Sequence, residues 1–125
     1  MILSVLTGLS MVVLTTTGPV NAEPSVARLS VQQKNAAVQT YVTRATECVA
    51  RKVAADPRFV HTNSPIDIGD LIVDSMPSCA ELMRAMIESY DHYFGDGTGE
   101  AFFTGPYLDI LPTAVTRWVE DSNRR

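Results

Sequence analysis

The fold is decided by residues 30–55, SVQQKNAAVQTYVTRATECVARKVAA. Apolar residues recur in this stretch at spacings of three and four, which places them on one face of an α-helix. On the opposite, polar face Glu47 precedes Arg51 by four residues, the favourable order for a helical ion pair. Asp56-Pro57 ends the helix, because a residue before proline avoids the α region. The apolar face comprises Val38, Tyr41, Val42, Ala45, Cys48, Val49 and Val53.

A short second helix is predicted after a linker at residues 58–63. Ser64 is suited to cap this helix and Pro65 to occupy its first position. The dipeptide Met76-Pro77 then interrupts the helical pattern. The residues that we expect to face inward are Ile68, Leu71 and Ile72.

A third helix is predicted to follow a capping box at residues 78–81 and to run to about Phe94. Ser78 and Glu81 have the spacing of a capping box, in which each side chain accepts one of the free amide protons at a helix start. Gly95 is well placed to end the helix. Its apolar face comprises Cys79, Leu82, Met83, Met86, Tyr90 and Phe94.

The remaining sequence predicts a loop and a last helix. Residues 95–100, with three glycines, are expected to form a mobile connector, and Phe102-Phe103 a brief extended segment. Pro106 can open the last helix. Pro112 either kinks that helix or divides a turn at 106–110 from a helix at 112–122. The expected inner face comprises Leu108, Leu111, Val115, Trp118 and Val119.

These patterns predict an all-α fold, a small bundle of three to four helices with one disulfide. Residues 23–125 are long enough for a single domain with a modest core. The chain has two cysteines, Cys48 and Cys79. An even cysteine count in an exported domain indicates a disulfide, and this one would join the first and third helices.

Residues 1–22 have the features of a cleavable signal peptide. They contain no charged side chain, and they break at Gly18-Pro19 before ending at Ala22. An apolar stretch runs through Leu9, Met11, Val12, Val13 and Leu14, although Thr7, Gly8 and Ser10 dilute it. Small residues at the last and third-last positions suit a signal peptidase, although no Lys or Arg opens the segment. A retained N-terminal anchor and a cytoplasmic protein are the alternatives, and the apolar run is shorter than the ~20 residues of a spanning helix. We therefore expect a periplasmic or secreted protein, with membrane contact only through the leader if it is retained.

The charge balance argues against nucleic-acid binding. The formal net charge is −4, from 10 Lys and Arg against 14 Asp and Glu. Binding to phosphates requires clustered cations that displace counterions, and no basic run occurs. No motif indicates a cofactor, because the glycines at 95, 97 and 99 lack the Lys-Ser or Lys-Thr of a phosphate loop. No feature of the sequence indicates an oligomeric state.

Two chemical hypotheses use the histidines. Cys48, His61, Cys79 and His92 form a zinc-like set, but no pair has the two-to-four-residue spacing of structural zinc sites. His92 near Glu88 and Asp91 resembles a general base beside carboxylates. No partnered nucleophile accompanies them, so we expect neither a metal site nor an enzyme.

The leading hypothesis is binding of another protein or peptide. Four of the nine aromatic residues lie in the last 24 positions, and apolar patches beside flexible loops are typical of binding sites. The predicted surface comprises Gly97, Gly99, Phe102, Phe103 and Tyr107, with the methionines 76, 83 and 86 as an adaptable lining. The alternative is that these aromatics are core residues. An acid-stress or chaperone-like role, in which low pH loosens the bundle, is the second hypothesis.

Overall fold

The computed structural model describes residues 25–61 and 65–125, so the predicted leader at 1–22 lies outside the described residues. Its helices are α1 (Val31–Ala55), α2 (Pro65–Ser75), α3 (Ala80–Phe94), α4 (Thr98–Phe102) and α5 (Leu108–Asn123). Short 3-10 turns span Val26–Arg28, Pro57–His61 and Met76–Cys79, and a π-helical turn spans Phe103–Tyr107. The described part contains no strand, which confirms the predicted all-α bundle.

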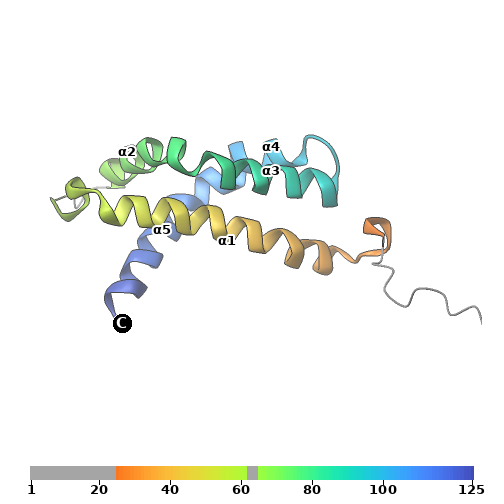
Figure 1. The fold of residues 1–125 in the computed structure, drawn as a ribbon, viewed down its shortest axis with the longest axis horizontal. Coiled ribbons are helices and arrows are strands. Elements are labelled where there is room, and N and C mark those ends of the chain that lie inside the picture. Colours follow the sequence, from red (N-terminus) through yellow and green to blue (C-terminus); the bar gives the residue numbers. More distant parts are fainter. Residues whose placement is uncertain (1–24, 62–64) are drawn as a thin grey trace, which may run out of the picture.

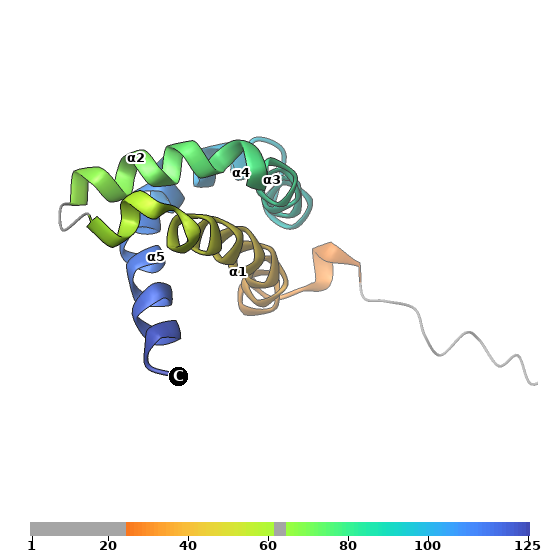
Figure 2. The same cartoon turned by 60° about the vertical axis from the view of Figure 1, so that its left-hand side comes forward.

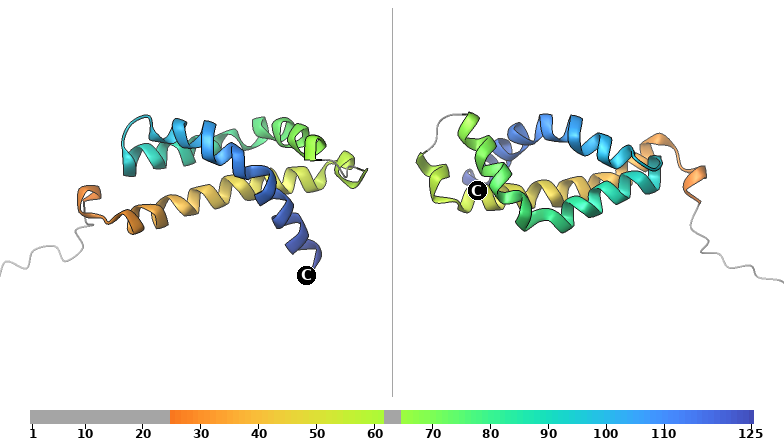
Figure 3. Two further views of the ribbon diagram at one scale, coloured as in Figure 1. Left: turned by 180° about the vertical axis from the view of Figure 1, so that it is seen from behind. Right: turned by 90° about the horizontal axis from the view of Figure 1, so that it is seen from above.

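The other helices pack along α1 (Figure 1). The segment from α2 through α3 follows one side of α1, and the segment from α4 through α5 follows another (Figures 1 and 2). The main packing partners of α1 are α3 and α5. Figure 3 shows α5 crossing α1, so that the C-terminal end of α5 points away from α2 and α3.

The predicted boundaries of α1 are confirmed at both ends. Ser30 is the N-cap, and its hydroxyl accepts a hydrogen bond from the Gln33 amide at 3.1 Å while the Gln33 side chain accepts one from the Ser30 amide at 2.8 Å. Asp56 is the C-cap before Pro57. The expected ion pair between Glu47 and Arg51 is present at 3.8 Å.

The core follows the predicted apolar faces. The prediction is wrong for Leu82, which is 37% exposed. Tyr41, Cys48, Tyr90 and Trp118 are only half-buried. The buried apolar residues are Val38, Ala45, Val49, Ala50, Val53, Leu71, Ile72, Cys79, Met83, Met86, Tyr107, Leu111, Val115 and Val119.

The predicted disulfide between Cys48 and Cys79 is present. Cys48 is half-buried on α1, and Cys79 is buried directly before α3, with 5.9 Å between the two Cα atoms. The bond therefore fixes the start of α3 against α1, and it closes a loop that contains all of α2.

The predicted capping box at the start of α3 is absent. The helix begins at Ala80, and its N-cap Cys79 makes no side-chain hydrogen bond. Ser78 does not form the expected capping box with Glu81, because Met76–Cys79 is a 3-10 turn that continues directly from α2 into α3. The preceding turn places carbonyl groups next to the first amides of α3, so these amides do not need a capping side chain.

The glycine-rich connector is shorter than predicted. Only residues 95–97 lie between helices, and α4 already starts at Thr98. The hydroxyl of Thr98 donates to the carbonyls of Gly95 at 2.7 Å and Tyr90 at 3.1 Å. The amide of Gly99 donates to the Asp91 carboxylate at 2.9 Å. These bonds hold the start of α4 against the end of α3. Gly97 has a φ of 87°, which favours glycine.

The predictions for Phe102-Phe103 and for the two prolines of the last segment need correction. Phe102-Phe103 is helical and not extended, because α4 runs through the π-helical turn into α5. Pro106 lies inside that turn and Pro112 lies inside α5. The division of a turn at 106–110 from a helix at 112–122 is therefore wrong. Pro112 cannot donate to the carbonyl four residues before it, and Figure 3 shows the path of this segment bending away from α3.

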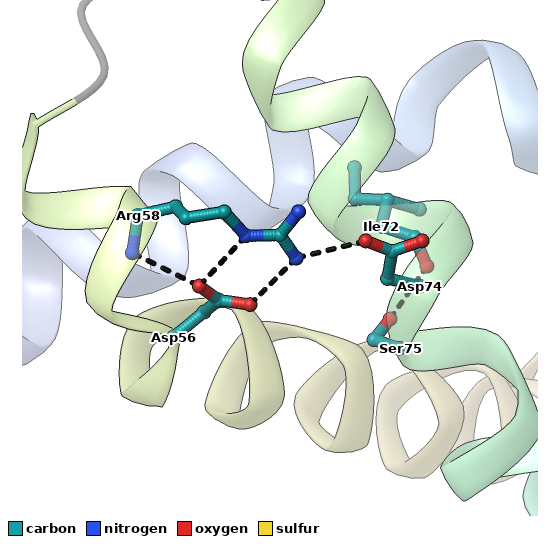
Figure 4. Close-up of polar contacts among 5 residues, drawn as sticks. All are labelled: Asp56, Arg58, Ile72, Asp74 and Ser75. Atoms are coloured by element: carbon teal, nitrogen blue, oxygen red, sulfur yellow. Dashed lines mark hydrogen bonds and ion pairs between the residues drawn. The ribbon is translucent and has the colours of Figure 1, made fainter.

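An ion-pair network joins the turn after α1 to α2 (Figure 4). The guanidinium of Arg58 donates to Asp56 at 2.9 Å and 3.1 Å and to Asp74 at 2.8 Å. The Arg58 amide also donates to Asp56 at 2.9 Å. These side-chain and backbone hydrogen bonds from Arg58 lower the pKa of Asp56 below its ordinary value of 3.8. Arg58 therefore connects both ends of the loop that the disulfide closes.

The network predicts a pH-dependent stability difference for Asp56→Asn. A carboxyl whose pKa is lowered by folding stabilises the protein above its ordinary pKa, and this contribution is lost as the pH falls through the folded value. We expect Asp56→Asn to lower the melting temperature at neutral pH and to have no effect near pH ~2. Asp70→Asn is the matched control, since Asp70 is exposed on α2. An equal loss for Asp56→Asn at both pH values, measured by circular dichroism, would contradict this prediction.

Candidate functional site

The structure separates the five residues of the predicted binding surface. Tyr107 is 1% exposed, and its hydroxyl lies 3.1 Å from the Thr46 hydroxyl. Gly99 is also buried. The prediction that these two lie on an exposed surface is therefore wrong. Gly97 is exposed in the loop before α4.

The two phenylalanines have different environments. The Phe102 ring stacks on the Tyr90 ring, with 4.1 Å between centroids, which ties α4 to α3. The Phe103 ring contacts the Tyr107 ring at a centroid distance of 6.0 Å, and it also lines an open groove. Phe103 is thus the predicted anchor that lines this groove.

This groove is a shallow depression, open to solvent, with a volume of about 560 Å³. It runs from the end of α2 along α3. Val73, on α2, is 62% exposed. We name this feature the α2–α3 groove; its lining residues are Val73, Met76, Pro77, Ala80, Met83, Arg84, Ile87 and Phe103.

The continuous path from α2 to α3 explains why these residues share a face. The 3-10 turn Met76–Cys79 keeps the chain helical across Pro77. Positions 73, 76, 77, 80, 84 and 87 therefore repeat at helical spacings along one side of the run. Two flexible methionines, 76 and 83, lie in the lining and can adapt to different apolar shapes. The third predicted lining methionine, Met86, is instead fully buried in the core.

Arg84 is the one charged residue in the groove lining. Its side chain is exposed, and it forms no ion pair with any carboxylate in the described residues. A guanidinium offers five donors arranged to match a carboxylate. The groove thus combines an apolar floor with one unpaired cation at its edge.

Most groove residues were missed by the sequence analysis. Val73, Pro77, Ala80, Arg84 and Ile87 were not singled out, because the helical pattern was interrupted at Met76-Pro77. A second apolar repeat on both sides of Pro77 was the available signal. This repeat can be recognised only if the helical pattern is continued across Pro77.

The residues of the catalytic hypothesis do not all come together. Glu88 and His92 line one cavity between α1 and α3. Asp91 is used elsewhere, since its carboxylate accepts the Gly99 amide. Ser89 also lines the cavity, but its hydroxyl donates to the Met86 carbonyl at 2.7 Å. No described residue therefore forms a nucleophile hydrogen-bonded to His92.

The proposed zinc set is incompatible with the disulfide. Cys48 and Cys79 are bonded to each other and offer no thiolate to a metal. His61 has its side chain outside the described part of the chain. Within the described residues no three His, Cys, Asp or Glu side chains are grouped to hold a metal ion.

Comparison with known proteins found no match for this chain among protein-family models, curated proteins or solved structures. None of the described helices has the length and apolar character needed to span a membrane.

Proposed function

We propose that this protein acts by binding, and that the α2–α3 groove takes an amphipathic segment of another protein. The partner carries an acidic side chain beside its apolar face. The observation that carries this proposal is the unpaired Arg84 at the edge of a groove whose other lining residues are apolar. The apolar face of the partner packs against the apolar lining residues, and its carboxylate binds the guanidinium of Arg84.

Exposure of Val73 supports the same proposal. Large apolar side chains with most of their surface in water are candidates for burial against a partner. The groove places Val73, Met76 and Phe103 side by side on one surface. Burying such side chains supplies affinity, whereas Arg84 supplies selectivity for an acidic partner.

We further propose that the protein is exported to the periplasm or secreted. Disulfides persist in oxidising compartments and are rare in the cytosol. The Cys48–Cys79 bond supports this proposal, and the features of residues 1–22 agree with it.

Two synthetic helical peptides test the groove. Both have the same face of Leu and Phe, and one carries Glu where the other carries Gln. We expect fluorescence anisotropy to show that the Glu peptide binds about threefold to fivefold more tightly, as for an exposed ion pair. Arg84→Gln is expected to remove this difference. Equal affinity of the two peptides for the unaltered protein would contradict the role of Arg84.

A matched pair of valine variants tests the apolar floor. Val73→Ser is expected to weaken binding of the Glu peptide about tenfold, because a buried valine contributes ~1–2 kcal/mol. Val31→Ser is the control, since Val31 is 66% exposed and lies outside the groove. Equal effects of the two substitutions would show that the peptide does not use this groove.

A further inference from the structure

A second pocket, of about 330 Å³ and open to solvent, lies between α1 and α3 and shares no lining residue with the α2–α3 groove. Tyr41 contributes from α1, and the other lining residues come from α3. We name it the tyrosine cavity; it is lined by Tyr41, Ala85, Glu88, Ser89, His92 and Tyr93.

The tyrosine cavity holds one carboxylate that is not neutralised. Glu88 forms no ion pair with any Lys, Arg or His of the described residues. The buried Ser89 hydroxyl is already bonded to the Met86 carbonyl. Glu88 is therefore the group in this cavity that is free to bind a positive charge.

Two aromatic rings accompany this carboxylate. Tyr41 and Tyr93 are both half-buried, so part of each side chain remains accessible from the cavity. The faces of tyrosine rings attract cations within about 6 Å of the ring centre. The His92 and Tyr93 rings meet in a T-shaped arrangement at a centroid distance of 4.8 Å.

We propose that the tyrosine cavity binds an organic ammonium ion, with Glu88 as the counter-charge and Tyr41 and Tyr93 as cation–π partners. Two aromatic rings with one carboxylate are suited to an alkylated ammonium group. They are poorly suited to a bare metal ion, which requires several hard ligands, and no cluster of three such ligands occurs in the described part. This site is independent of peptide binding in the groove.

Choline and its uncharged isostere 3,3-dimethylbutan-1-ol test the proposal, because they differ in charge and hardly in shape. We expect choline to cause saturable shifts in the ring NMR signals of Tyr41 and Tyr93. The neutral alcohol is expected to bind at least about tenfold more weakly. Absence of saturable shifts with choline, or equal affinity of the alcohol, would overturn the proposal.

Three variants assign the roles within the site. Glu88→Gln and Tyr93→Leu are each expected to weaken choline binding about tenfold, whereas Tyr93→Phe keeps the ring and binds nearly as well. Glu81→Gln is the matched control, since Glu81 is exposed on the same helix and lies outside the cavity. If Tyr93→Leu fails to fold, Glu88→Gln still decides the question. Unchanged choline affinity in Glu88→Gln would overturn the assignment.

Discussion

Replacing Cys48 and Cys79 together by serine is expected to lower the free energy of unfolding by about 3–4 kcal/mol. The two residues are 31 positions apart, so the bond restricts a long loop in the unfolded chain. A domain of this size has a total stability of only ~5–10 kcal/mol. Loss of the disulfide therefore removes a large part of the stability.

Urea unfolding followed by circular dichroism measures this loss. The wild-type protein in reducing agent is the internal control, because it should reproduce the midpoint of the double serine variant. The variant itself should not respond to the reducing agent. A loss below ~1 kcal/mol would show that packing of α1 against α3 holds the bundle without the covalent bond.

Gly99→Ala is expected to destabilise the protein by about 1–3 kcal/mol, the usual cost of overpacking. A Cβ atom at Gly99 would overlap the carbonyl oxygen of Ile87 and lie 2.7 Å from its carbonyl carbon. Both neighbours are backbone atoms, which cannot move without shifting α3 or α4. The substitution also strains the hydrogen bond that the Gly99 amide donates to the Asp91 carboxylate. This hydrogen bond holds the start of α4 in place.

Gly105→Ala is the matched control for Gly99→Ala. Nothing lies within 4 Å of a Cβ atom built at Gly105, and its φ is not positive. The same chemical change is therefore expected to be neutral or to stabilise the protein by up to ~1 kcal/mol. Thermal unfolding of both variants gives the comparison, and equal melting temperatures would show that the close contact at Gly99 carries no energetic cost.

Features that depend on neighbouring residues could be predicted from the sequence. The ends of α1 follow from the residues around Ser30 and from Asp56-Pro57, which act within one or two turns. The end of α3 at Gly95 is equally local. The pairing of Cys48 with Cys79 followed from the cysteine count and from the expectation of export, because two cysteines allow only one pairing.

Features that depend on distant contacts could not be predicted. Tyr107 is buried in the core, and its phenol hydroxyl is paired with the hydroxyl of Thr46, 61 positions earlier. The start of α4 at Thr98 depends on a carboxylate from Asp91 that accepts the Gly99 amide. A run of glycines contains no sign of either partner, so it was interpreted as a mobile connector.

The groove was only partly foreseen for a different reason. Phe103, Met76 and Met83 were named as binding residues, but the chain was expected to break at Pro77. Proline is tolerated in the first turn of a helix, where its missing amide is not needed. The 3-10 turn Met76–Cys79 uses Pro77 in this way, and the apolar repeat therefore continues from Val73 to Ile87.

The location of peptide binding tests the central claim most directly. Methyl NMR signals of the protein are recorded while the Glu peptide is added. The account predicts that the largest shifts occur at the methyl groups of Val73, Met76, Met83 and Ile87, which all line the α2–α3 groove. Shifts centred instead on Val31 or Ile110, which are exposed outside the groove, would contradict the account.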